Sequence, residues 1–282
     1  MGDMSGQLGQ IVFVVWRESV EALLVVGIIN AWLAHQGKTP EAARGRRFLW
    51  AGVSTGVILA VALAAMLLFF GELLPEEGQE WFQTGMVLVA AGLIVQMVIW
   101  MRRHGRTLKR ELEDGAARSM ADANWWGLFV LALLAVAREG SETVVFLYGI
   151  LAGAPIDTTS SVGAAAVGGF MAVATYWLLQ LGGRYLSWRL FFRVTEIMLL
   201  LLAASLVMSG IDHLISLDIV PVLSRPLWDT SGLLEDGGAF GGFVSGLTGY
   251  RARPDLTGLI TYAAYWLLVL LLLPRTAAPK KA

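Results

Sequence analysis

The sequence predicts an all-α membrane protein of seven transmembrane helices, arranged as two inverted three-helix repeats plus one extra helix. Three observations support this prediction: an apolar composition, seven long apolar stretches, and a charged motif that occurs twice. Of the 282 residues, 56% are hydrophobic and 15% are charged, whereas about a quarter of an ordinary soluble domain is charged. This composition argues against a soluble enzyme, and the absence of cysteine excludes disulfides, thiolate metal sites and iron–sulfur sites.

The seven apolar stretches are long enough, or nearly so, to cross a bilayer, whose core of about 30 Å takes roughly 20 helical residues. Peptide groups find no water in the hydrocarbon core, so each crossing is expected to be a helix. The stretches lie at about 10–34, 48–70, 82–101, 125–151, 162–183, 194–213 and 256–273. The domains that follow are a first repeat (1–101), a basic linker (102–124), a second repeat (125–213), a Gly-rich connection (214–255) and a last helix with its tail (256–282).

Basic residues between the spans lie mostly on one side of the membrane. Sixteen Lys and Arg fall in 35–47, 102–124, 184–193 and the C-terminal tail, against three in the connections on the other side. Because cytoplasmic loops carry the excess of Lys and Arg, we expect an inner-membrane protein with its N-terminus outside and its C-terminus in the cytoplasm. The first ten residues hold no Lys or Arg, which argues against a cleaved signal peptide.

Two arginines lie inside spans, and each begins an R-E-x-x-E motif. Residues 17–21 (RESVE) in the first span match residues 138–142 (REGSE) in the fourth. Two short strings, Ala60-Val61-Ala62 and Ala172-Val173-Ala174, extend the match weakly into the second span of each repeat. Because each repeat has three crossings, the second copy must be inverted relative to the first. Inverted repeats are a transporter design, with the site near the midplane where the copies meet.

Helical geometry places Arg17, Glu18 and Glu21 on one narrow face, because successive residues turn by about 100°. The motif at 138–142 repeats this face on an antiparallel helix, so four carboxylates and two guanidinium groups share a small volume if the faces meet. A structural salt-bridge cluster is the simpler interpretation. Against it, each charge at mid-depth costs on the order of 3 kcal/mol, and each arginine needs only one carboxylate.

The charge of the two motifs suits a cation. Four carboxylates and two arginines sum to −2 when all are ionised, and a divalent or trivalent cation would bring this to 0 or +1. Oxygen-only ligation suits hard cations, Fe³⁺ among them, and Mg²⁺, Ca²⁺ and Mn²⁺ also fit. The arginines are expected to orient the carboxylates and keep them ionised.

Two such motifs on the first and fourth spans resemble those of the FTR1/EfeU family of iron permeases, the oxidase-dependent iron transporters. The resemblance covers most of the chain and includes residues 228–231 (WDTS) and 249–254 (GYRARP) of the outer connection. The first motif departs from the family at Ser19-Val20, where Gly-Leu is usual. The charged positions are intact, so we interpret this departure as a change in helix packing.

The resemblance implies a high-affinity permease and no enzyme. The transported substrate would be iron, with Fe³⁺ favoured over Fe²⁺, and no organic cofactor is implied. The implied partners are a periplasmic iron-binding protein or ferroxidase and membrane lipid, with no nucleic acid; a homo-oligomer is left open. The implied metal ligands and their supporting arginines are Glu18, Glu21, Glu139 and Glu142, with Arg17 and Arg138.

Other polar residues are candidates for the path of the ion. Four glutamates form an acidic outer loop that either collects cations or is simply solvated: Glu72, Glu76, Glu77 and Glu80. The last two match an outer E-x-x-E of the family. Aligned repeats pair Glu196 with Gln83 as possible path-lining residues, although an interfacial ion pair between Glu196 and Arg193 is the simpler interpretation. His213 is either an interface residue or a ligand, and the connection 214–255 is expected to fold over the outer mouth or to dock a partner.

Three alternatives stay open. The same glutamates suit a permease for Mn²⁺ or Pb²⁺, or a proton-coupled carrier. A carboxylate di-iron oxidase also uses glutamates, but its E-x-x-H is missing from the spans. A subunit that only recruits a ferroxidase would tolerate replacement of Glu21 or Glu142 by Gln.

Overall fold

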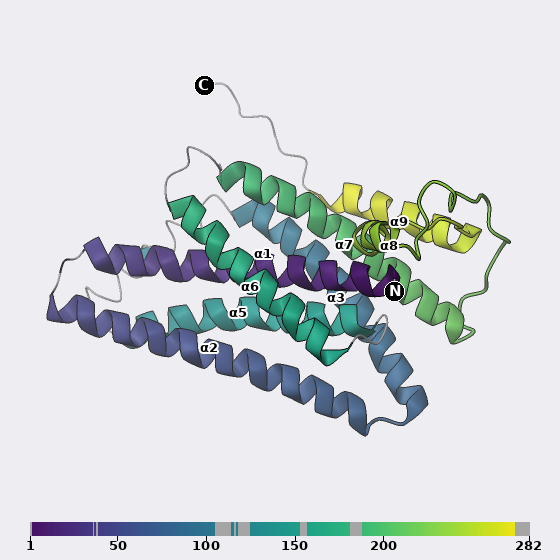
Figure 1. Ribbon diagram of the computed structural model, residues 1–282. Helices are drawn as coiled ribbons and strands as arrows, with labels where there is room; N and C mark the ends of the chain where they lie inside the picture. The colour runs from purple at the N-terminus through teal and green to yellow at the C-terminus, as the bar shows by residue number, and fades with distance from the viewer. Residues whose placement is uncertain are drawn as a thin grey trace.

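The computed structural model consists of long helices packed side by side, as Figure 1 shows. It describes residues 2–35, 37, 39–104, 114–115, 117, 125–152, 157–180 and 188–273, and in these ranges all regular structure is helical. The helices are α1 (Gly2–His35), α2 (Pro40–Leu73), α3 (Glu76–His104), α5 (Trp125–Ala152), α6 (Thr158–Gln180), α7 (Trp188–Ser216), α8 (Ala239–Thr248) and α9 (Leu256–Leu272). Each of the seven expected spans overlaps a helix, of which α9 is the shortest with 17 residues, whereas the short helix α8 was not expected.

Several helices are suited to a membrane by their length and apolar surface. By length and composition, α2, α3, α6 and α7 are long and apolar enough to cross a bilayer, and α9 is a shorter apolar helix. Large apolar side chains point outward from α2 and α6, such as Ile58 (65% exposed), Phe69 (64%) and Phe170 (76%). Exposed apolar surface on this scale is unfavourable in water, whereas lipid solvates it. The chain is therefore a multi-pass membrane protein.

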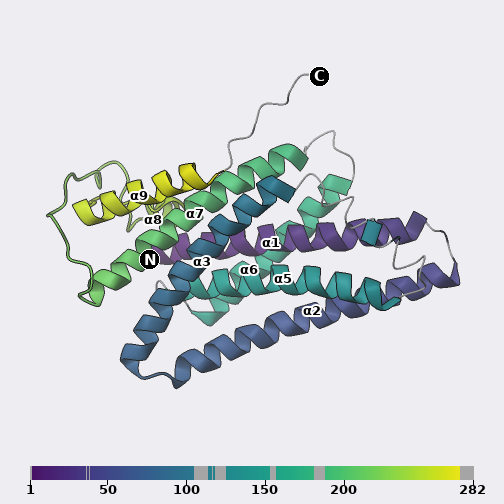
Figure 2. The same cartoon turned by 180° about the vertical axis from the view of Figure 1, so that it is seen from behind.

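Successive long helices run in opposite directions, so their ends gather at two ends of the bundle (Figures 1 and 2). We call one of them the α8 end, which holds Gly2, the turn between α2 and α3, and helix α8. The opposite end holds His35 and the first turns of α2 and α5, and we call it the basic end because Arg44, Arg46 and Arg47 lie there.

Small residues lie at the two most extensive helix contacts, which pair α1 with α6 and α2 with α5. A Cβ atom added at Gly56 of α2 would lie 2.9 Å from Cβ of Val136, and one at Gly168 of α6 would lie 3.0 Å from Cβ of Val15. Only glycine leaves room for backbones this close. Val15 and Val136 each stand two residues before a motif arginine, so each motif helix is crossed by its partner at the same position relative to its motif.

The acidic segment 71–80 is not a loop, and this expectation was wrong. Helix α2 continues to Leu73 and α3 begins at Glu76, so only Leu74 and Pro75 form the turn between them. Polar residues favour a loop in a sequence-based prediction, but Glu76 and Glu77 lie in the first turn of α3, where the positive end of the helix dipole stabilises acidic side chains. All four glutamates of the segment are exposed, as expected for the end of a bundle.

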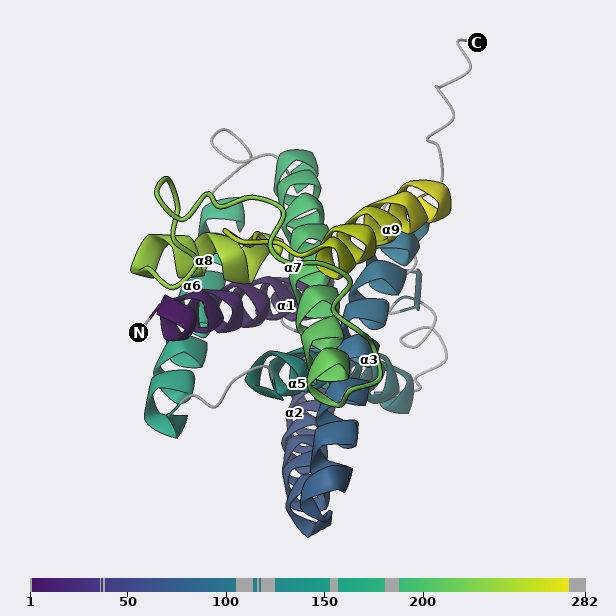
Figure 3. The same ribbon diagram turned by 90° about the vertical axis from the view of Figure 1, so that its right-hand side faces the viewer.

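The connection 214–255 is an ordered cap on the α8 end. Helix α8 packs against α1 and α7 (Figure 3), and a Cβ atom at Gly6 would lie 2.2 Å from the carbonyl oxygen of Gly242. Two backbone hydrogen bonds of 2.9 Å tie the two arms of the connection together: Thr230 N–H donates to the carbonyl oxygen of Ala252, and Leu227 N–H to that of Pro254. The connection therefore folds over this end, whereas its docking of a partner stays a prediction. Most of the basic linker, 102–124, lies outside the described residues.

Replacing Gly56 with Leu is expected to lower the melting temperature of the detergent-solubilised protein. The new side chain would collide with Val136, and overpacking costs about 1–3 kcal/mol. Gly85→Leu in α3 is the matched control, since nothing lies within 4 Å of a Cβ atom there. Equal melting temperatures for the two variants would contradict the close crossing of α2 and α5.

Candidate metal site

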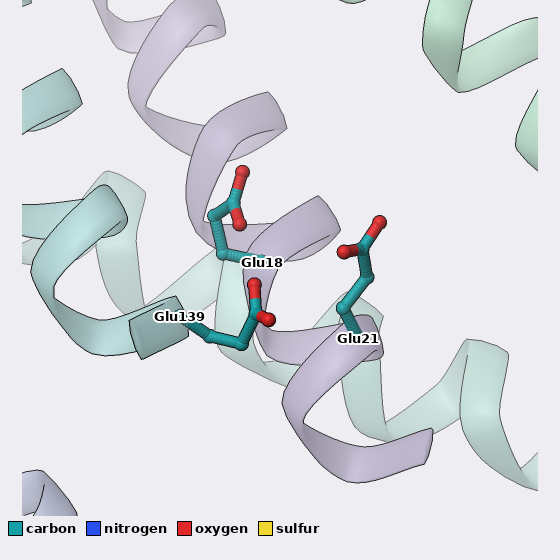
Figure 4. Close-up of side chains that lie close together, drawn as sticks. All are labelled: Glu18, Glu21 and Glu139. Carbon is teal, nitrogen blue, oxygen red and sulfur yellow. The ribbon is translucent and has the colours of Figure 1, made fainter. Parts of the chain in front are cut away.

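The two R-E-x-x-E motifs meet at the centre of the bundle. The first lies halfway along the 34-residue α1, and the second halfway along the 28-residue α5. These two helices pack against each other. Carboxylate oxygens of Glu18 and Glu21 from α1 and of Glu139 from α5 lie within 4.8 Å of one another (Figure 4). We call these three side chains the carboxylate group.

The carboxylate group is buried and holds oxygen atoms without protein donors. Glu18 is 1% exposed and Glu139 is 7% exposed. The Oε2 atoms of both residues are buried without a hydrogen-bond partner among the described residues. Buried anionic oxygens are costly unless they are paired or coordinate a metal. The group can therefore present oxygens to a cation.

Arg17 is the buried partner of this group. Its side chain is fully buried, its Nη1 donates to Oε1 of Glu18 at 2.7 Å, and its Nη2 forms an ion pair with Glu21. Three carboxylates beside one guanidinium leave a net charge of −2 when all are ionised. Together with the oxygen-only donor set, this charge suits a hard cation.

Glu142, the fourth expected ligand, lies beside the carboxylate group and outside its 4.8 Å limit. Its Oε1 accepts a 3.0 Å hydrogen bond from Nε of Arg138. Its Oε2 is buried with no hydrogen-bond partner in the described structure, and its charge interacts with those of Glu18 and Glu21. Three of the four expected ligands therefore lie together in the carboxylate group, and the fourth, Glu142, is paired with Arg138 beside it.

Helix α3 supports both motif arginines, which sequence reasoning missed. Nη1 and Nη2 of Arg17 contact the sulfur atoms of Met97 and Met101, and the guanidinium of Arg138 lies 4.0 Å above the ring of Trp100. Stacking of a cation on an aromatic face is favourable, the more so away from water. The available signal was the i, i+4 spacing of the two methionines, which puts them on one face of the third span.

Glu196 has a different partner from the one the sequence indicated. It forms an ion pair with Arg102 of α3, and its expected i, i+3 partner Arg193 is not paired with it. Helix α3 packs along α7 (Figure 2), so a tertiary neighbour replaces the local one. Glu196 is therefore still in a partly exposed ion pair, but this pair joins α3 to α7 instead of two residues of one helix.

The remaining candidates lie away from the carboxylate group. Glu72, Glu76, Glu77 and Glu80 are exposed at the α8 end, and Gln83 is half-buried near the same end of α3. The carbonyl oxygen of His213 accepts hydrogen bonds near the end of α7. Among the described residues, the carboxylate group is the one set of three acidic or histidine side chains gathered closely enough to hold a metal. Roles for these outer residues stay predictions.

The fold and this site together define a multi-pass helical membrane protein with charged carboxylates buried at its centre. The iron permease FTR1 family matches residues 8–278 of the chain. The chain therefore belongs to the FTR1 family of iron permeases, and the family expected from the two motifs is confirmed.

Similar proteins cover almost the whole chain. It is 30% identical over 279 residues to the ferrous iron permease EfeU of Escherichia coli O6:H1 (strain CFT073), which covers 94% of this chain and 95% of that protein. The ferrous iron permease EfeU of Yersinia pestis is 28% identical over 276 residues, 94% of each chain. That of Shigella sonnei (strain Ss046) is 30% identical over 262 residues, 88% of this chain and 89% of that protein. No solved structure matches the chain.

Replacing Arg17 with Leu is expected to destabilise the protein strongly, because Glu18 and Glu21 would lose their buried counter-charge. Removing one partner of a buried ion pair costs about 3–5 kcal/mol. Arg102→Leu is the control, because Arg102 is 30% exposed in its pair with Glu196 and surface pairs contribute about 0–1 kcal/mol. Thermal unfolding in detergent checks this, and a smaller loss for Arg17→Leu than for Arg102→Leu would contradict it.

Proposed function

We propose that the chain moves iron inward across the cytoplasmic membrane through the carboxylate group, with its N-terminus outside. Membership of the FTR1 family supports iron as the transported substrate. The main support for this path of the ion is that Glu18 and Glu21 meet Glu139. Their carboxylate oxygens come from two distant segments of the chain and gather in the middle of the bundle. A purely structural ion-pair cluster would leave no reason for the unpaired Oε2 atoms.

In this mechanism the iron ion exchanges part of its water shell for carboxylate oxygens. The net charge of the carboxylate group with Arg17 attracts the ion into a low-dielectric region that would otherwise exclude it. Arg17 holds Glu18 and Glu21 in place, and Arg138 does the same for Glu142. The two arginines also keep the negative charge from growing so large that the ion is trapped.

We further propose that the transported iron is Fe³⁺. All-oxygen donors favour Fe³⁺, delivered by a ferroxidase or a periplasmic iron-binding protein. Fe²⁺ is the second candidate, because the EfeU relatives are named ferrous iron permeases and a divalent ion neutralises a charge of −2. Mn²⁺ and Pb²⁺ fit the same donors, and competition against iron uptake separates them from the true substrate.

Two inverted three-helix repeats are the proposed basis of the transport movement. The crossings support this, because Gly56 packs on Val136 as Gly168 packs on Val15. These residues correspond under the alignment of the two motifs and of the Ala-Val-Ala strings. Rocking of one repeat against the other would expose the site to each side in turn.

Replacing Glu139 with Gln is expected to reduce iron uptake into proteoliposomes at least tenfold, because the site loses a charge and a ligand. Glu18→Gln and Glu21→Gln should behave alike, and Fe²⁺ and Fe³⁺ are offered separately to identify the valence. Glu41→Gln, an exposed residue in the first turn of α2, is the matched control and should keep wild-type uptake. Undiminished uptake by Glu139→Gln would show that the ion takes another route.

A further inference from the structure

A cavity of about 450 Å³ lies at the α8 end, between α1, α5, α7 and the segment around α8. This volume accommodates roughly 15 water molecules at about 30 Å³ each, enough for a cation with its first water shell. Polar side chains from α1, α7 and the segment around α8 reach its wall, among them Gln7, Gln10, Ser209, Asp212, Ser245 and Tyr250.

The walls of the cavity are tied together by specific contacts. Gln10 of α1 is 5% exposed and donates hydrogen bonds to the carbonyl oxygen of Gly246 in α8 and, at 3.4 Å, to the hydroxyl of Ser205 in α7. Arg251 forms an ion pair with Asp212 at the end of α7. The cavity is therefore a built compartment under the α8 cap.

The cavity is aligned with the carboxylate group along α1. Gln10, Val14 and Glu21 lie on one face of this helix, within about 40° of one another. Val14 stands one turn from Gln10 and one turn from Glu18, so the cavity wall and the carboxylate are about 12 Å apart at 1.5 Å per residue. On α5, Gly149 lines the cavity and Phe146 stands between it and the motif.

An apolar layer separates the two compartments. Val14 of α1, Phe146 of α5 and Leu202 of α7 are fully buried and belong to one packed cluster. Beyond the carboxylate group, Met97 and Met101 cover Arg17 on the side of α3. A dry apolar constriction resists the passage of an ion because the ion would lose its water without gaining ligands.

We propose that this cavity is the vestibule from which a hydrated metal cation reaches the carboxylate group. The layer of Val14, Phe146 and Leu202 is the barrier that is closed in this structure and must part for the ion to pass. The inference rests on the proposed function, since it places the vestibule on the outer side of the same path.

The absence of cysteine from the chain allows a direct test with single-cysteine variants. Ser209→Cys places a thiol in the vestibule, and Thr159→Cys places one on the exposed start of α6, outside it. Spheroplasts are treated with a membrane-impermeant, positively charged methanethiosulfonate, and the proteins are then purified and reconstituted. Both variants should react. The modification should lower iron uptake by Ser209→Cys at least tenfold and leave uptake by Thr159→Cys unchanged.

The proposal that the cavity is a vestibule would be overturned if Ser209→Cys failed to react, or if the modified protein still took up iron at the unmodified rate. Val14→Cys tests the barrier and should react at least tenfold more slowly than Ser209→Cys, so equal rates would overturn the barrier. The rates of cysteine modification are measured without iron, so they test the access to the cavity independently of whether the protein transports iron. Absent uptake by the unmodified wild type would count against the proposed function instead.

Discussion

The buried ion pairs of Arg17 with Glu18 and Glu21 are the constraint on which the rest of the structure depends. A fully buried guanidinium in an apolar bundle is tolerated only when carboxylates surround it, and buried carboxylates need the same compensation. Helix α3 completes the arrangement by covering Arg17 with Met97 and Met101. The cluster still leaves carboxylate oxygens without donors, which is the feature that favours our proposal of a cation site over a purely structural network.

Close helix crossings bring this chemistry together. The motif helices α1 and α5 each pack on the second helix of the other half of the chain, with Gly168 and Gly56 at the contacts. In lipid, helix association depends on van der Waals packing more than on the hydrophobic effect, so small residues at crossings decide the geometry. One carboxylate from α5 can then reach two from α1, and neither helix builds the site alone.

The sequence predicts the long helices and one charged face on each motif helix, because apolar length and a 100° helical step are local properties. Whether the two faces meet was left open by the sequence, and the structure brings them together. The sequence does not predict what depends on tertiary neighbours. Glu196 pairs with Arg102 of α3 instead of a residue on its own helix, and Trp100 stacks on Arg138 across the bundle. Helix α8 is short and glycine-rich, so the sequence does not indicate it by hydrophobic periodicity, and the cavity beside it forms only when α8 packs on α1 and α7.

The most direct test of the account is X-ray absorption spectroscopy at the iron edge on the purified, iron-loaded protein, with Glu139→Gln beside it. We predict that oxygen atoms surround the iron in the wild type, because Glu18, Glu21 and Glu139 offer carboxylates. Glu139→Gln should bind less iron and show an altered shell. A sulfur ligand from the neighbouring Met97 or Met101, or a spectrum that Glu139→Gln leaves unchanged, would contradict a carboxylate site between α1 and α5.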